Sequence, residues 1–356
     1  FIFIARFINA MGFFVFPFLT LFLTRNLSLN ADKVGFWLML VEIGRISGAL
    51  FGGIMADHWG RKVILMGCQI ATALILLPCA FLEESFLIPK FLIAAAFFNG
   101  AIHPAIDAIL VDISNRRNRK EIFSFIYLGL NLGFGIGSLI AGFLYVNYIK
   151  WLFLGNVLAI TLVCIVIGLY VPETIPKSIL TKDILKSDLS ITPNHKSANL
   201  ISALLKQPVI LCFFLVTIFF FLVHSQFFFS LPLQLDTIFL KQGPSIFGLV
   251  MSFNCFVVVF MTIPVTLIFK RNRPIANVLL SGLLFALGFG MLRWISDFFL
   301  ILVSTFIWTI GEVLLRINAG VYIANHSPYT LRGRFNSLIT IGGSISRIIG
   351  PPLLGM

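Results

Sequence analysis

Several ionisable side chains lie inside long apolar stretches of this 356-residue chain, where a charged group is energetically unfavourable. They are Glu42, Arg45, Asp107, Glu312, Arg316 and Arg347. A charge at the middle of a bilayer costs roughly 2.5–3.5 kcal/mol on insertion scales, so such side chains face a protein interior or a watery cavity. The chemistry open to them is to carry a proton, hold a cation or bind an anion.

The spacing of these charges favours pairing. Glu42 and Arg45 are three residues apart, and Glu312 and Arg316 are four apart, which are contact distances on a helix. Structural ion pairing is therefore the alternative to a functional role. Glu312 and Arg347 lie about 13 residues into their stretches, which is about 20 Å of helix and close to the midplane. Transporters built from helical repeats bind substrate at that depth.

Uncharged polar residues in the apolar stretches leave two interpretations open. Asn131, Gln226 and Asn254 can line a cavity or form hydrogen bonds between helices. His103 and His224 can titrate near neutral pH or make a fixed polar contact. The sequence does not separate these alternatives.

The composition requires a membrane around these residues. Hydrophobic residues make up 59% of the chain and charged residues 11%, and the mean hydropathy is +1.01. Lipid is the solvent that suits such a chain. A span needs about 20 mostly apolar residues. Eleven spans are expected, at 3–23, 34–56, 63–82, 91–111, 122–146, 151–171, 209–233, 246–269, 275–294, 298–324 and 335–356.

Polar and basic residues divide the chain and orient it. We expect an N-terminal six-helix bundle at 1–171, a linker at 172–207 and a C-terminal bundle at 208–356. The linker and the loops on its side carry sixteen Lys and Arg residues, and the opposite loops carry six. The positive-inside rule then places the linker and the N-terminus in the cytoplasm, in a plasma (inner) membrane. The net charge of +12 is explained by these loops, so no nucleic-acid partner is expected.

Both ends of the chain interrupt apolar stretches. It starts at Phe1 without an initiator Met, and Met356 falls inside the eleventh span. We therefore expect a fragment in which the C-terminal bundle has five helices and a twelfth helix is truncated.

The loop after the second span contains the most specific motif, which runs from Gly53 to Lys62 and reads GIMADHWGRK. Gly53 allows close helix approach, Asp57 can meet Arg61, and Gly60 permits a tight turn. This loop resembles the GxxxDxxGRK signature of the major facilitator superfamily. The glycine-rich run 131–142 looks like the motif of its proton-driven exporters, although Ser138 stands where proline is expected.

The resemblance covers essentially the whole chain and implies an all-α membrane protein with two six-helix bundles. It implies a secondary transporter that works by alternating access, most similar to the proton-driven multidrug exporters. Asp57, Arg61 and Asp112 would latch the two bundles on the cytoplasmic side, together with Gly53 and Gly60. Glu312, Arg316 and Arg347 would form the polar core of a cavity between the bundles. Many members have arginine where this chain has Asn99, which weakens proton coupling at that position.

Other classes of function find less support. His103 and Asp107 form an HxxxD string that suggests acyl transfer, but no nucleophile or metal-ligand cluster accompanies it. No filter-like loop suggests a channel. No GxxxxGK[ST] signature is present, so an ion gradient, by resemblance protons, is the expected energy source, and no cofactor or metal is expected. The remaining alternative is a carrier of an anionic or zwitterionic metabolite on the same fold. A monomer is expected.

Overall fold

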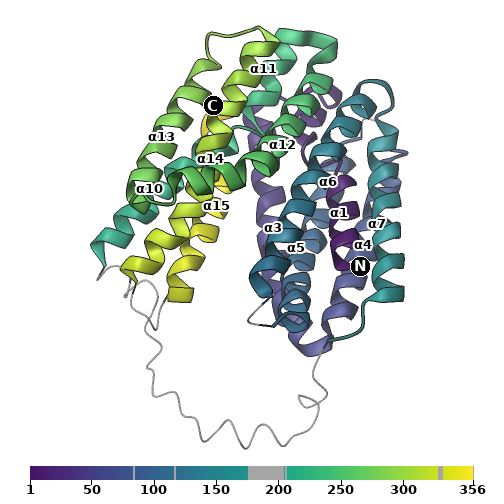
Figure 1. The fold of residues 1–356 in the computed structure, drawn as a ribbon. Coiled ribbons are helices and arrows are strands. Elements are labelled where there is room, and N and C mark those ends of the chain that lie inside the picture. The colour runs from purple at the N-terminus through teal and green to yellow at the C-terminus, as the bar shows by residue number, and fades with distance from the viewer. Residues whose placement is uncertain (83–84, 116–117, 175–203, 205–206, 328–331, 356) are drawn as a thin grey trace, which may run out of the picture.

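The computed structural model describes residues 1–82, 85–115, 118–174, 204, 207–327 and 332–355. The regular structure in these ranges is helical (Figure 1). The first part has α1 Ile2–Met11, α2 Leu19–Leu21, the π-helix Phe22–Asn26, α3 Ala31–Trp59, α4 Arg61–Cys79, α5 Leu87–Ile113, α6 Arg119–Asn147 and α7 Lys150–Tyr170. The second has α10 Pro208–Ser225, α11 Ser230–Phe239, a 3-10 turn Leu240–Gln242, α12 Gly243–Phe269, α13 Pro274–Met291, α14 Phe298–His326 and α15 Arg332–Gly355.

The helices have the length and surface of a membrane protein. Among the described residues, eight stretches are long and apolar enough to cross a bilayer, with Pro208–Phe269 counted as one stretch. Large apolar side chains such as Leu50, Phe219 and Leu279 are exposed on the outside of the molecule. Such a surface is stable in lipid and would aggregate in water. The prediction of an all-α membrane fold is confirmed.

Figure 1 shows two groups of helices, which we call the N-half (α1–α7) and the C-half (α10–α15). We call the end where α7 stops and α10 starts the linker end, and the opposite end the far end. α3 packs against α15, and α6 packs against α12. Residues 175–203 and 205–206 of the expected linker lie outside the described residues, and the domain boundaries at 171 and 208 remain a prediction.

Two of the expected spans are broken by proline. The expected helix 3–23 stops at Met11, and the chain turns before Leu19; the expected helix 209–233 stops at Ser225 and restarts at Ser230. Pro17 and Pro232 lack the N–H of a continuous helix, and their rings clash with the carbonyl four residues earlier. For Pro232 that carbonyl belongs to Phe228, and it accepts a hydrogen bond of 2.6 Å from the buried hydroxyl of Thr20. This hydrogen bond joins the two broken segments across the halves.

The far end holds further contacts between the halves. Arg25, at the end of the π-helix, forms an ion pair of 2.5 Å with Asp236 of α11 and donates to the carbonyl oxygen of Leu240. Ser245 of α12 donates to the carbonyl oxygen of Gly142 on α6 at 3.2 Å. These contacts join the N-half to the C-half at the end remote from the linker.

Close packing of α3 on α5 depends on glycine. A Cβ atom at Gly52 would lie 2.3 Å from the carbonyl oxygen of Ala101, and one at Gly48 would lie 1.8 Å from that of Phe97. At Gly53, which the sequence analysis assigned to this role, the nearest atom would be a Pro104 carbon at an ordinary 3.8 Å. The signature glycine is thus one position away from the glycine that the helix contact requires.

Alanine substitutions at Gly52 and Gly53 should differ in their effect on stability. Gly52→Ala should destabilise the protein by about 1–3 kcal/mol, the usual cost of overpacking, because the obstacle is backbone that cannot rotate away. Gly53→Ala is the matched control and should have little effect on stability. Thermal unfolding of both purified variants in the same detergent tests this. Equal melting temperatures would contradict the assigned packing.

Candidate functional site

A cavity of 310 Å³ lies between the two halves. Its charged lining comes from both: Glu42 and Arg45 on α3, Arg316 on α14 and Arg347 on α15. The broken segments shape it as well, since Pro17 and Phe228 contribute to its wall. The remaining wall is largely aromatic, with side chains from Phe13, Phe16, Phe134, Phe221, Phe228 and Phe229. The cavity can therefore receive a molecule that has both an apolar body and a charge.

Glu42 connects the halves across this cavity. Its Oε2 accepts from Nε of Arg45, one turn along α3, at 2.9 Å. Its Oε1 accepts from Nε of Arg347 on α15 at 2.8 Å. The spacing of Glu42 and Arg45 thus produces the pair it predicted. Arg347, which the sequence analysis grouped with Glu312 and Arg316, instead pairs with Glu42, because the contact between α15 and α3 brings them together.

Glu312 and Arg316 form the second charged group, on α14. Arg316 Nε donates to Glu312 Oε1 at 2.9 Å, as their four-residue spacing predicted. Oε2 of Glu312 accepts from Nδ2 of Asn254 on α12 at 3.3 Å. Nε2 of His224 on α10 lies 3.5 Å from Oε1. Asn254 and His224 therefore contact the same carboxylate. The sequence had left open whether each of them makes a polar contact of this kind or has another role.

The exposure of these side chains determines whether the cavity surface is positively or negatively charged. The carboxylate side chains are buried, with 6% of Glu42 and 9% of Glu312 exposed. The guanidinium side chains are accessible, with 35% of Arg45, 43% of Arg347 and 52% of Arg316 exposed. A molecule that enters the cavity meets cationic groups first, because each carboxylate lies behind its arginine partners.

Asp107 and Asn131 lie nearer the linker end of the N-half. Asp107 Oδ1 is 3.5 Å from Nη2 of Arg6, a buried arginine on α1. Asn131 Nδ2 donates to the carbonyl oxygen of Tyr127 at 2.9 Å, within α6, and its side chain lines a second cavity beside the first. Arg6 was not among the residues predicted from the sequence, although its charge inside the first apolar stretch was the available signal.

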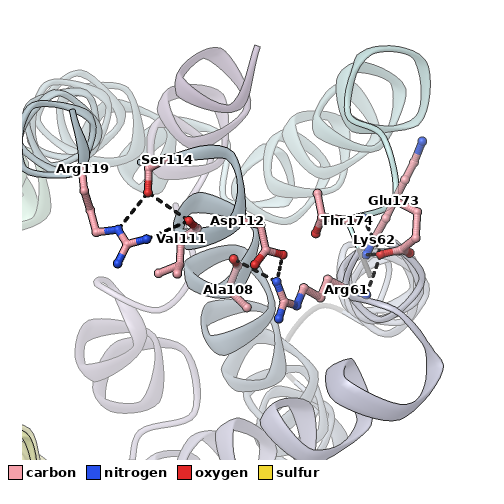
Figure 2. A network of polar contacts seen from close by, with 9 residues as sticks. All are labelled: Arg61, Lys62, Ala108, Val111, Asp112, Ser114, Arg119, Glu173 and Thr174. Atoms are coloured by element: carbon pink, nitrogen blue, oxygen red, sulfur yellow. Dashed lines mark hydrogen bonds and ion pairs between the residues drawn. The ribbon is translucent and has the colours of Figure 1, made fainter. Parts of the chain in front are cut away.

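The signature loop forms a polar network at the linker end, which Figure 2 shows. Arg61 forms an ion pair with Asp112 of α5 and donates to the carbonyl oxygen of Ala108 at 3.3 Å. Glu173, just after α7, accepts from the backbone N–H groups of Arg61 at 3.0 Å and Lys62 at 3.1 Å. A carboxylate at these N–H groups satisfies the first turn of α4 and favours its dipole.

In the signature loop, Gly60 has the expected role, whereas Asp57, Arg61 and Asp112 make different contacts from those expected. Gly60 has a φ of 113°, so the tight turn does require glycine. Asp57 is exposed and makes no hydrogen bond or ion pair within the described residues, so it does not contact Arg61. The pair Arg61–Asp112 joins α4 to α5 inside the N-half. In this conformation the halves meet at the middle and the far end, so the expected latch between them is not formed by these residues.

Metal chemistry has no candidate in the described ranges, where no cluster of His, Cys, Asp and Glu side chains could hold an ion. The five cysteines are free thiols, and Cys68, Cys79 and Cys255 are buried.

Comparisons with known proteins agree with this architecture. The family model described as Major Facilitator Superfamily matches residues 2–351. A Na(+), Li(+), K(+)/H(+) antiporter from Planococcus maritimus is 24% identical over 97% of this chain and 85% of its own length. The 4-hydroxybenzoate transporter PcaK from Pseudomonas aeruginosa is 25% identical over 48% of this chain and 39% of its own length. The crystal structure of the nucleoside transporter NupG has a TM-score of 0.73 at 16% identity, and the match covers 99% of this chain and 89% of that one.

Proposed function

Since this chain belongs to the major facilitator superfamily and is a secondary transporter, we propose that it carries a small organic anion with an aromatic or other apolar body. The observation that carries the proposal is the exposed set of Arg45, Arg316 and Arg347 in front of buried carboxylates. Guanidinium groups bind carboxylates through paired, charge-assisted hydrogen bonds. The phenylalanine wall would hold the body of the substrate. The similarity to a 4-hydroxybenzoate transporter supports the same class of substrate.

Glu42 gives the proposal a mechanism. It accepts a hydrogen bond from Arg347 as an internal anion, where a substrate carboxylate would bind. A substrate carboxylate would compete for Arg347 and free the contact between α3 and α15. A ligand can shift the two halves only through such a difference in binding between conformations. Gly53, Asp57, Gly60, Arg61 and Asp112 remain proposed gate residues, for a conformation that closes the linker end.

Proton coupling is part of the proposal, and its support is the contact of Glu312 with His224. Nε2 of His224 and Nε of Arg316 both lie against Oε1 of Glu312, so a change of charge at the contact of His224 with Glu312 would alter how Arg316 is held. The positive-inside count supports a cytoplasmic linker and N-terminus, and the protein is proposed to act as a monomer.

Antiport of a monovalent cation is the second candidate. It rests on the antiporter that matches nearly the whole chain and on the buried carboxylate of Glu312. Export of a lipophilic cationic drug, which the sequence resemblance suggested, has less support in the cavity, because its acids are shielded and its arginines are exposed.

Transport by the purified chain in proteoliposomes tests these candidates. We expect uptake of labelled 4-hydroxybenzoate under an imposed pH gradient, inhibited by benzoate and not by the neutral isostere benzamide or by a tetraphenylphosphonium cation. A second set of liposomes with an internal pH dye receives Na⁺ or K⁺. Cation-dependent proton movement without any response to benzoate would reject the anion proposal in favour of antiport. Transport of the tetraphenylphosphonium cation without any transport of 4-hydroxybenzoate would favour drug export.

A further inference from the structure

A second cavity, of 290 Å³, adjoins the central one within the N-half. We call it the Arg6 compartment. Its polar lining comes from α1, α3, α5 and α6, with the side chains of Arg6, Asn9, Arg45, Asn99, His103, Tyr127 and Asn131. It shares Phe13, Phe134, Arg45 and Asn99 with the central cavity, so the two cavities lie side by side. The arrangement places a second polar site next to the central cavity.

Arg6 is the unexplained group in this compartment. It is 6% exposed, and its Nε has no hydrogen-bond partner. Its Nη2 lies 3.5 Å from Oδ1 of Asp107, whose own side chain is 57% exposed. Buried polar groups in proteins are almost always hydrogen-bonded, and a guanidinium can only donate. The Nε–H of Arg6 is therefore a buried donor with no acceptor among the described residues.

The other residues that line the compartment also favour binding of a hydrogen-bond acceptor. No acidic side chain lines the compartment among the described residues, although two arginines do. The amides of Asn9 and Asn99 make no hydrogen bond within the described ranges and can donate. Asp107, the one acid near Arg6, is outside this lining. A group with negatively charged oxygens matches this set of donors.

We propose that the Arg6 compartment is a second anion subsite and that the transported molecule is two-ended, with a carboxylate at each end. This rests on the proposed function. The first carboxylate binds at Arg316 and Arg347, the apolar body lies along Phe13 and Phe134, and the second carboxylate receives the free N–H of Arg6. The preferred substrate class is therefore an aromatic dicarboxylate rather than a monocarboxylate.

Calorimetric titration of the purified full chain tests this with matched ligands: benzoate, terephthalate and the longer 4-carboxycinnamate. At least one dicarboxylate should bind about tenfold or more tightly than benzoate, the gain expected for one added hydrogen bond to a charged group. Arg6→Gln should remove that gain and leave the Kd of benzoate within about twofold, since benzoate does not reach Arg6. Asn9→Asp, which adds a negative charge to the compartment alone, should weaken dicarboxylates and not benzoate.

The outcomes separate this inference from the proposed function. No binding of benzoate to the unmodified chain would overturn the anion proposal itself. Binding of benzoate with no advantage for either dicarboxylate would overturn only the second subsite. Loss of benzoate and dicarboxylate binding together in Arg6→Gln, with Asn9→Asp unchanged, would give Arg6 a structural role and also overturn it. Chloride or phosphate that binds through Arg6 without competing with dicarboxylates would assign the compartment to a separate inorganic anion.

Discussion

Replacing Arg347 by glutamine should raise the Kd for a small aromatic carboxylate by about 10–100-fold, because a hydrogen bond to a charged group contributes about 1.5–3 kcal/mol. Arg347 is the accessible guanidinium that an incoming carboxylate can take over from Glu42. Arg347→Lys keeps the charge but loses the planar fork, so it should give an intermediate affinity. Titration of the purified variants with benzoate measures both changes.

An exposed arginine supplies the control. Arg271, between α12 and α13, has no hydrogen bond or ion pair within the described residues, so Arg271→Gln makes the same chemical change away from the cavity. Its Kd should equal that of the unmodified chain. Thermal unfolding without ligand separates loss of binding from loss of fold. An unchanged Kd in a folded Arg347→Gln protein would remove this residue from the substrate site.

Local sequence patterns predicted local structure well here. The spacing of Glu42 with Arg45 and of Glu312 with Arg316 gave the observed pairs, since helix geometry alone fixes those distances. Gly60 was predictable because a turn with positive φ excludes other side chains. Most spans were also found within a few residues, because apolar length is a strong signal.

Contacts between distant segments were not predictable in the same way. Arg347 meets Glu42 because of how α15 rotates against α3, and nothing in either helix alone sets that rotation. The broken helices were missed because Pro17 and Pro232 lie in apolar runs whose hydropathy hides the interruption. Their partnership through Thr20 and Phe228 depends on the meeting of the two halves. Candidate residues were therefore found by type, and their grouping required the structure.

Glu42→Gln should have the opposite effect to Arg347→Gln and lower the Kd for the carboxylate by about tenfold. The amide keeps the shape of Glu42 but no longer competes as an anion for Arg45 and Arg347. Transport should slow at the same time, because a substrate held more tightly without a competitor is released less readily. Binding by titration and turnover in proteoliposomes measure the two effects separately. Glu121→Gln, at an exposed acid in the first turn of α6, is the matched control and should change neither.

The sign of this change tests the anion proposal and the role of Glu42 in it. If the cavity selects anions, removing a buried negative charge makes it more cationic and strengthens carboxylate binding. If Glu42 is instead a ligand for a transported cation, the same substitution abolishes cation movement and leaves carboxylates without effect. Weaker carboxylate binding in a folded Glu42→Gln protein would mean that Glu42 positions Arg347 rather than competing for it. Each result assigns a different role to Glu42, a carboxylate that pairs with arginines of both halves.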